Sequence, residues 1–99
     1  MARTLEWTVH VYLFEEDGTT KARAVLETGT STMTGLGTAR CNPEDVDIPA
    51  IGDELAAARA MHHIAAQLMR AADHDMQEVG SLPPGTQHRE AYGWTNAMA

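Results

Sequence analysis

The sequence predicts an α+β domain in which three antiparallel strands are followed by one long helix. Two early stretches alternate between apolar and polar residues, which is typical of strands. Residues 50–79 instead carry apolar residues at three- and four-residue spacing, which is typical of a helix. The chain has 99 residues, the length of a single domain, and its 43% of hydrophobic residues is ordinary for a globular protein.

A tight hairpin is predicted at the start of the chain. Residues 5–15 alternate between two faces, and residues 20–28 form the return strand. Asp17-Gly18 between them is a strong signal for a two-residue turn. A slip by one residue would place basic side chains on the core face, so the pattern supports this register. Its apolar pairs are Val9 with Leu26, Val11 with Ala24 and Leu13 with Ala22.

The third strand is expected at residues 31–40, after a turn at Gly29-Thr30. Gly35 and Gly37 lie on one face of this strand, where they remove side-chain bulk. We therefore expect a helix to approach this face closely.

One long helix is expected over residues 50–79, with Pro49 suited to its first position and Gly80 to its end. It would span roughly 45 Å, whereas a ten-residue strand covers only about 33 Å. Either the helix breaks near Ala72-Asp73 or a partner covers the excess length. The apolar face expected on it consists of Ile51, Leu55, Ala58, Met61 or His62, Ala65, Leu68, Ala72, Met76 and Val79.

Residues 1–82 are expected to form this single domain, and residues 83–99 form a C-terminal tail without periodicity. Tyr92 and Trp94 stand out in the tail. They could dock on the domain or on a partner, and a disordered tail is an equal alternative.

Charge and cysteine content restrict the function classes. The net charge of −7 opposes nucleic-acid binding through overall charge, so only a local basic patch could bind RNA. Cys41 is the only cysteine, which excludes an intramolecular disulfide and fits a reducing compartment. The start lacks an apolar signal core, and no stretch approaches the roughly 20 apolar residues of a membrane span. We expect a cytoplasmic protein without membrane association.

The sequence predicts no catalytic, cofactor or metal site, and no small-molecule substrate is evident. His62 and His63 are adjacent, and neither forms the i, i+4 histidine pair of zinc-binding helices. Gly35-Leu36-Gly37 lacks the remaining residues of a phosphate-binding loop, so a packing role is favoured.

An enzyme is the third class of function considered. It would need a concave pocket in which His10, His62 or Cys41 has a carboxylate partner. A lone cysteine also needs a nearby base and a lowered pKa, and the sequence indicates neither. We therefore expect a protein that is not an enzyme.

One candidate binding surface emerges on the side of the sheet away from the helix, and we call it the basic-aromatic face. Aromatic stacking combined with phosphate contacts is a common way to hold single-stranded RNA. Two alternatives remain: a solvated face with Arg23 over Tyr12, or an interface with a second copy of the chain. The basic-aromatic face consists of Tyr12, Phe14, Lys21, Arg23 and Arg40.

A longer motif resembles a known family. The residues that carry the resemblance are Gly35-x-Gly37-x-Ala39-Arg40-x-Asn42-Pro43-x-Asp45, then Pro49-x-Ile51-Gly52-Asp53-Glu54-Leu55-Ala56-x-Ala58-Arg59-Ala60, with Trp7-Thr8-Val9 and His74-Asp75. Over residues 5–79 the chain is similar to a small actinobacterial family with a dsRBD-like fold, domain of unknown function eighteen-seventy-six.

The resemblance implies three strands plus a helix, intertwined dimers, and a link to dormancy and hypoxia. It also implies a ribosomal role by likeness to hibernation factors, which the acidic charge opposes. No catalytic residues carry over. At matched positions it implies Ile51 and Leu55 in the core, and Arg40 and Arg59 in contact with acids of residues 44–47.

The leading hypothesis is a non-enzymatic homodimeric binding module with a stress-linked role. The alternative is a ribosome- or RNA-binding protein that uses the basic-aromatic face.

Overall fold

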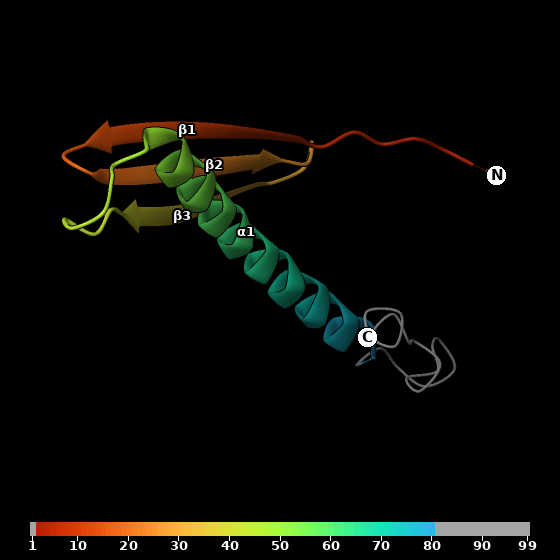
Figure 1. The fold of residues 1–99 in the computed structure, drawn as a ribbon. Coiled ribbons are helices and arrows are strands. Elements are labelled where there is room, and N and C mark those ends of the chain that lie inside the picture. The colour runs from red at the N-terminus through yellow and green to blue at the C-terminus, as the bar shows by residue number, and fades with distance from the viewer. Residues whose placement is uncertain (1, 81–99) are drawn as a thin grey trace. The chain divides into compact units, whose positions relative to one another are not determined.

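The computed structural model describes residues 2–80, and the tail prediction for residues 83–99 lies outside them. The predicted α+β class is confirmed, because a three-stranded sheet is followed by one long helix (Figure 1). The described residues fall into two units, 2–67 and 68–80. The elements are β1 (Thr8–Glu16), β2 (Thr19–Glu27), β3 (Thr32–Arg40) and α1 (Pro49–Gly80).

The predicted hairpin register is confirmed residue by residue. β1 and β2 are antiparallel and are joined at Asp17 and Gly18, whose φ angles are 51° and 73°. Positive φ at both positions is the type I′ geometry that suits the twist of the flanking strands. The pairs are Val9 with Leu26, Val11 with Ala24, Leu13 with Ala22, Tyr12 with Arg23, and Phe14 with Lys21.

β3 lies on the other side of β2, so the strand order is β1-β2-β3 and both β1 and β3 are edge strands. The connecting turn is closed by a 3.0 Å hydrogen bond from the Thr28 N–H to the Ser31 carbonyl, with Gly29 at φ 92°. The hydrophobic core is small, and its residues come from β2, β3 and the first part of α1. They are Ala22, Ala24, Leu26, Ala39, Ala56, Ala60 and Ile64.

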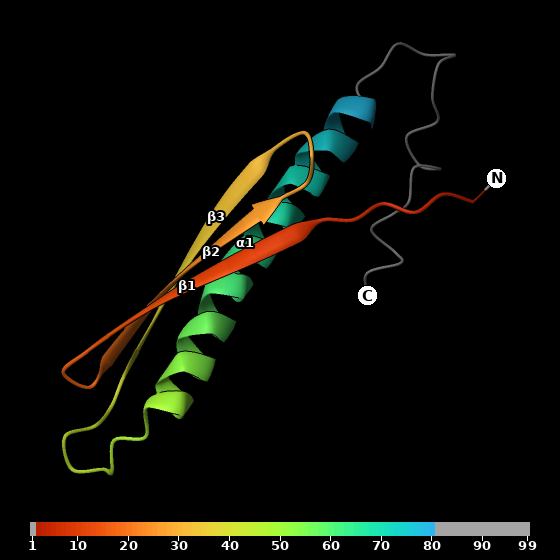
Figure 2. The ribbon, with the colours of Figure 1, turned by 90° about the horizontal axis from the view of Figure 1, so that it is seen from above.

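The predicted close approach of a helix at the two glycines of β3 is confirmed. A Cβ at Gly35 would collide with the Ala60 carbonyl and lie 2.7 Å from Cγ1 of Ile64. A Cβ at Gly37 would collide with the Ala56 carbonyl. Figures 1 and 2 show residues 49–67 of α1 along one face of the sheet.

The helix face predicted for the core was wrong. Ile51 and Leu55 are exposed, while Ala56, Ala60 and Ile64 are buried against the sheet. At the glycines of β3 the helix backbone comes so close to the strand that Ala56 and Ala60 fit there, with Ile64 packed beside Gly35. Ile51 and Leu55 lie on the outer side of the helix.

The long helix is continuous, so the first of the two alternatives, a break near Ala72-Asp73, does not occur. α1 begins at Pro49, as expected, and the Ile51 N–H at its start donates a 3.0 Å hydrogen bond to the Ile48 carbonyl. Over residues 68–80 most side chains are exposed. Among the described residues, no helix has the length and apolar character needed to cross a membrane.

Candidate functional site

β1 is exposed on both of its faces. Every one of its residues is exposed, including those that share a face with the core. Val9, Val11 and Leu13 have exposed fractions of 43%, 37% and 46%, although the residues opposite them on β2 are buried. The helix therefore covers β2 and β3 and leaves the apolar side of β1 in contact with solvent.

The outer side of α1 adds a second apolar surface in the same unit of the chain. Ile51, Leu55 and Met61 are each about half exposed. Half-exposed side chains of this size leave apolar area in water that a packed neighbour would remove at about 25 cal/mol per Å². We call these three residues, together with Val9, Val11 and Leu13, the uncovered apolar surface.

The free edge of β3 is occupied by side chains of α1. Arg59 Nη1 donates a 2.7 Å hydrogen bond to the Thr38 carbonyl, and Gln67 Nε2 donates one of 2.7 Å to the Thr34 carbonyl. Between them, the Leu36 N–H donates a 2.9 Å hydrogen bond to Nδ1 of His63. These three side chains stand four residues apart on α1 and satisfy backbone groups that an edge strand otherwise leaves free.

The contact expected of Arg59 was wrong. Its guanidinium binds the Thr38 carbonyl, and among residues 2–80 the ion pairs are His10 with Glu27 and His74 with Glu78. No ion pair between an arginine and the acids of residues 44–47 forms in the described part of the chain. The Thr38 carbonyl at the sheet edge is an acceptor that Arg59 reaches directly from α1.

Four residues of the basic-aromatic face meet in one shallow groove. The guanidinium carbon of Arg23 lies 4.7 Å from the centre of the Tyr12 ring, a cation–π distance. Phe14 and Lys21 are directly opposite each other in the next ladder row of the same face. Together with Leu36 they line a hollow of about 210 Å³.

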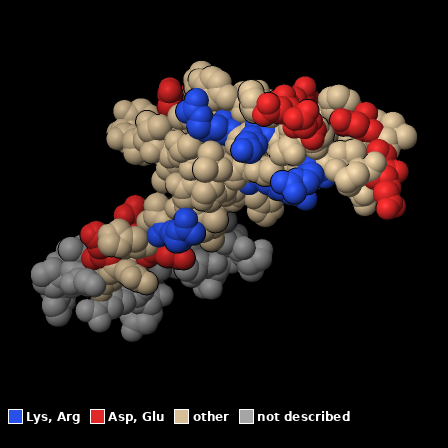
Figure 3. Space-filling model, turned by 90° about the vertical axis from the view of Figure 1, so that its left-hand side faces the viewer, with Lys and Arg blue, Asp and Glu red and all other residues tan. Residues whose placement is uncertain are grey.

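Arg40 lies on the same face but at its end. It pairs with Thr19 beside the hairpin turn and lines a different, more acidic hollow. Figure 3 shows basic side chains gathered in the middle of the sheet-bearing part and acidic ones mostly toward one end. The basic-aromatic face is therefore a local patch within an acidic molecule.

A larger hollow of about 450 Å³ lies at the hairpin-turn end of the sheet. Asp53 raises the pKa of Glu15 above its usual value through a carboxyl–carboxylate hydrogen bond and charge repulsion, with smaller contributions from desolvation and Asp47. Oδ1 of Asp53 is buried without a hydrogen-bond partner among the described residues. The acids that line the hollow are Glu15, Glu16, Asp17, Asp45 and Asp47.

The three residues considered for an enzyme lie in separate places. Cys41 lines the hairpin-end hollow, where its thiol faces the carbonyls of Asn42, Asp45 and Val46 at 3.4–3.9 Å. His10 stands 4.0 Å from Glu27 on the sheet, and His62 is exposed on α1. The residues considered for catalysis are therefore not gathered around one cavity.

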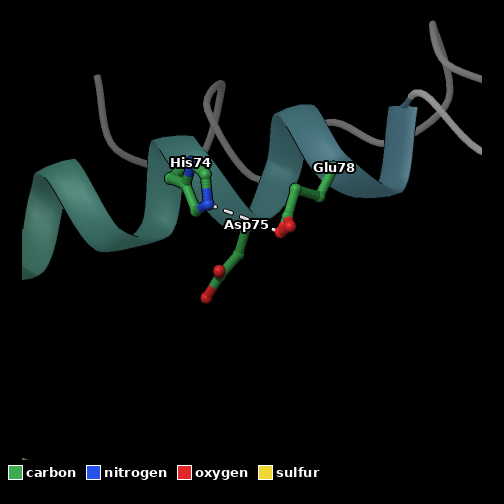
Figure 4. A group of neighbouring side chains, drawn as sticks. All are labelled: His74, Asp75 and Glu78. Carbon is green, nitrogen blue, oxygen red and sulfur yellow. Dashed lines mark ion pairs between the residues drawn. The ribbon is translucent and has the colours of Figure 1, made fainter.

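A cluster that sequence inspection missed lies on residues 68–80. One ligand atom from each of His74, Asp75 and Glu78 lies within 4.8 Å of the others, and all three side chains are exposed (Figure 4). His74 Nε2 is 3.4 Å from Glu78 Oε1. The i, i+4 spacing of His74 and Glu78 was the available signal, and it is also the spacing of an ordinary helix-surface ion pair.

Comparison with known proteins shows that this chain has relatives in mycobacteria. The family model described as Rv2632c-like matches residues 5–84. The uncharacterised protein Mb1767 of Mycobacterium bovis is 38% identical over 77 residues, which cover 78% of this chain and 82% of that protein. The uncharacterised protein Rv2632c of Mycobacterium tuberculosis is 39% identical over 69 residues, which cover 70% and 74%.

A solved structure has the same fold. The crystal structure of Rv2632c superposes with a TM-score of 0.68 at 35% sequence identity, and the match covers 84% of this chain and 96% of the other. The expected small actinobacterial family of unknown function is thereby supported at the level of these mycobacterial relatives. The dsRBD-like description stays a prediction.

Proposed function

The chain belongs to the Rv2632c-like family, and from that premise we propose that it is a non-enzymatic homodimeric binding module. A link to stress or dormancy is part of this proposal through the family resemblance, and a place in the cytoplasm is part of it because a lone cysteine fits a reducing compartment. The observation that carries the proposal is the uncovered apolar surface.

The size of the core supports a dimer. The buried hydrophobic residues are mostly alanines, and among the described residues no large side chain is fully buried. A domain this small, with its larger apolar residues in solvent, gains little stability from its own core. A second copy that covers Val11 and Leu13 would supply part of the missing burial.

Sedimentation equilibrium at micromolar concentration tests the dimer. We expect a mass of twice the 10.7 kDa of the chain. Leu13→Asp should shift the equilibrium toward monomer, because it places a charge among the apolar side chains of β1 in the proposed contact. Val46→Asp makes the same kind of change at an exposed apolar position of the loop before α1, so it is the matched control and should leave the mass unchanged. A wild-type mass of 10.7 kDa throughout the range would contradict the proposal.

A second candidate function is ribosome or RNA binding through the basic-aromatic face. The stacked pair of Arg23 and Tyr12, beside Lys21 and Phe14, combines cations and rings in one hollow. This combination suits single-stranded nucleic acid, in which bases stack and phosphates need positive charge. The net charge of −7 opposes it outside this patch.

Ribosome co-sedimentation discriminates between the two candidates. If RNA is bound there, changing Lys21→Glu together with Arg23→Glu should abolish binding, and wild-type binding should weaken steeply with salt. Arg3→Glu with Arg70→Glu makes the same charge change at exposed positions outside this face. Equal loss in both double variants would indicate a general charge effect, and no loss in the first would remove this face as the site.

A further inference from the structure

The two edge strands of the sheet differ in whether the backbone groups on their outer sides are hydrogen-bonded. On β3, the Thr34 carbonyl, the Leu36 N–H and the Thr38 carbonyl point away from β2, as their hydrogen bonds to side chains of α1 show. On β1, no hydrogen bond to the outer edge forms among residues 2–80. An edge that is closed on one side only leaves one strand free to pair with another chain.

The pairing of the three strands determines which backbone groups of β1 point outward. Since the outward groups of β3 are those of Thr34, Leu36 and Thr38, Gly35 and Gly37 hydrogen-bond to β2. The groups of Ala22 and Ala24, opposite these glycines, are therefore used toward β3. Alternate β2 residues, including Lys21 and Arg23, must then bond to Phe14 and Tyr12 on β1. The outward N–H and C=O groups of β1 consequently belong to Val9, Val11, Leu13 and Glu15.

β1 also lacks the features that usually protect an edge strand. Its nine residues contain no proline and no lysine, and its two acids, Glu15 and Glu16, stand at one end. The remaining residues are mainly β-branched or aromatic, and all are exposed. The strand is thus a long, regular edge with apolar side chains on both faces.

We propose that β1 pairs antiparallel with β1 of a second copy, with Tyr12 on the two-fold axis, so that the two sheets form one of six strands. This inference rests on the proposed homodimer and specifies its contact. In this register Val11 lies opposite Leu13 of the second copy, and Val9 opposite Glu15. All four outward residues of each strand are then used in hydrogen bonds.

Charge selects the antiparallel orientation. A parallel pairing would place Glu15 and Glu16 beside the same acids of the second copy, and like charges side by side are destabilising. Asp53 already raises the pKa of Glu15, so further negative charge there would add to an existing repulsion. The antiparallel pairing puts the acidic ends at opposite ends of the ladder.

The pairing has consequences on both faces of the sheet. On the core side, the half-exposed Val11 of one copy lies beside the half-exposed Leu13 of the other, which reduces the apolar area in water. On the other side, the two basic-aromatic faces become neighbours across the axis. The dimer therefore presents one continuous surface that contains Tyr12 and Arg23 twice.

Single-cysteine crosslinking tests the register in a Cys41→Ser background. Tyr12→Cys should form a disulfide-linked dimer on mild oxidation, because directly opposite residues of a non-hydrogen-bonded pair have Cα atoms about 4.5 Å apart, within disulfide reach. His10→Cys alone should not link, since the two copies of residue 10 would be about 13 Å apart along the ladder. A mixture of His10→Cys and Phe14→Cys should link. Equal linking by His10→Cys and Tyr12→Cys would overturn the register.

Amide hydrogen exchange on the unmodified protein provides a second measurement that needs no variant. We expect the N–H groups of Val11 and Leu13 to be protected to the same degree as those of Tyr12 and Phe14, which face β2 in the ladder. A dimer by sedimentation in which Val11 and Leu13 exchange freely would overturn the strand pairing while the proposed dimer stands. A monomer at all concentrations would overturn both, and fast exchange in it would leave the edge free in solution.

Discussion

The backbone N–H of Leu36 donates its hydrogen bond to Nδ1 of His63, 27 residues further along the chain. Both residues are exposed, so this bond lies at the rim of the sheet and not in its core. It is the middle of three contacts through which α1 satisfies the backbone of β3. Removing it should therefore affect both stability and the edge of the sheet.

His63→Ala should lower the free energy of unfolding by about 1 kcal/mol relative to His62→Ala, because only His63 accepts a backbone hydrogen bond. Both variants gain the same helix propensity, so His62→Ala controls for that gain. Chemical denaturation measures the difference. Equal stability of the two variants would show that a hydrogen bond from the Leu36 N–H to water is as favourable as the one to His63.

Gly35→Ala should destabilise the fold by about 2–3 kcal/mol, because the added methyl group meets the backbone of Ala60 and has no space to move into. Thermal unfolding followed by circular dichroism measures the loss. Thr38→Ala on the opposite face of the same strand is the control and should change stability much less. A Gly35→Ala protein as stable as wild type would mean that α1 can move away from β3 without cost.

Glu15→Gln should stabilise the protein at neutral pH, because it removes a charge that is repelled by Asp53. The folded-state pKa of Glu15 is raised, so the folded protein holds this proton more tightly than the unfolded chain does. The stabilising effect of that proton is complete at pH below the unfolded pKa and is lost as the pH rises through the folded pKa.

The advantage of Glu15→Gln should therefore shrink as the pH falls and Glu15 becomes protonated in the wild type. Thermal melts across the acidic range measure this, with Glu16→Gln as the control of equal charge change. A benefit that is independent of pH, or that is the same for Glu16→Gln, would rule out the contact with Asp53 as its cause.

Val11→Pro should leave the monomer folded but weaken the dimer by about 30-fold. The lost N–H points outward, so each copy loses about 1 kcal/mol of intermolecular hydrogen bonding and none to β2. Tyr12→Pro should instead destabilise the monomer, since its N–H belongs to the ladder with β2. Sedimentation and thermal melts together separate the two effects, and similar behaviour of both variants would argue against the free edge.

The hairpin was predictable because two independent constraints agree. Asp17-Gly18 fixes the turn, and the period of two in the flanking residues then decides which side chains share a face. The pairs Tyr12 with Arg23 and Phe14 with Lys21 follow directly, and with them most of the basic-aromatic face.

The packing face of α1 was not predictable in the same way, because two apolar patterns coexist on this helix. Hydrophobicity favours the larger residues, such as Ile51 and Leu55, whereas the space above the glycines of β3 admits Ala56 and Ala60. The shape of the sheet decides between them, and that shape becomes known only once the strands are paired.

The side chains that close the β3 edge were missed for a related reason. Arg59, His63 and Gln67 have the composition of a solvated helix face. Their four-residue spacing becomes informative only when it is compared with alternate residues of β3. A polar series at helical spacing opposite a glycine-containing edge strand is a signal that could have indicated their role.

The repeat distance of these contacts along the helix nearly matches the repeat distance of outward backbone groups along the strand. Four residues of a helix rise about 6.0 Å, while two residues of a strand advance about 6.7 Å. The two scales stay in phase for only a few steps, and the contacts from Arg59 to Gln67 occupy such an interval. A displacement of α1 by half a step along β3 would put all three side chains opposite the wrong backbone groups at once. Arg59, His63 and Gln67 therefore fix the position of α1 along β3, whereas Gly35 and Gly37 set only the distance between α1 and the sheet.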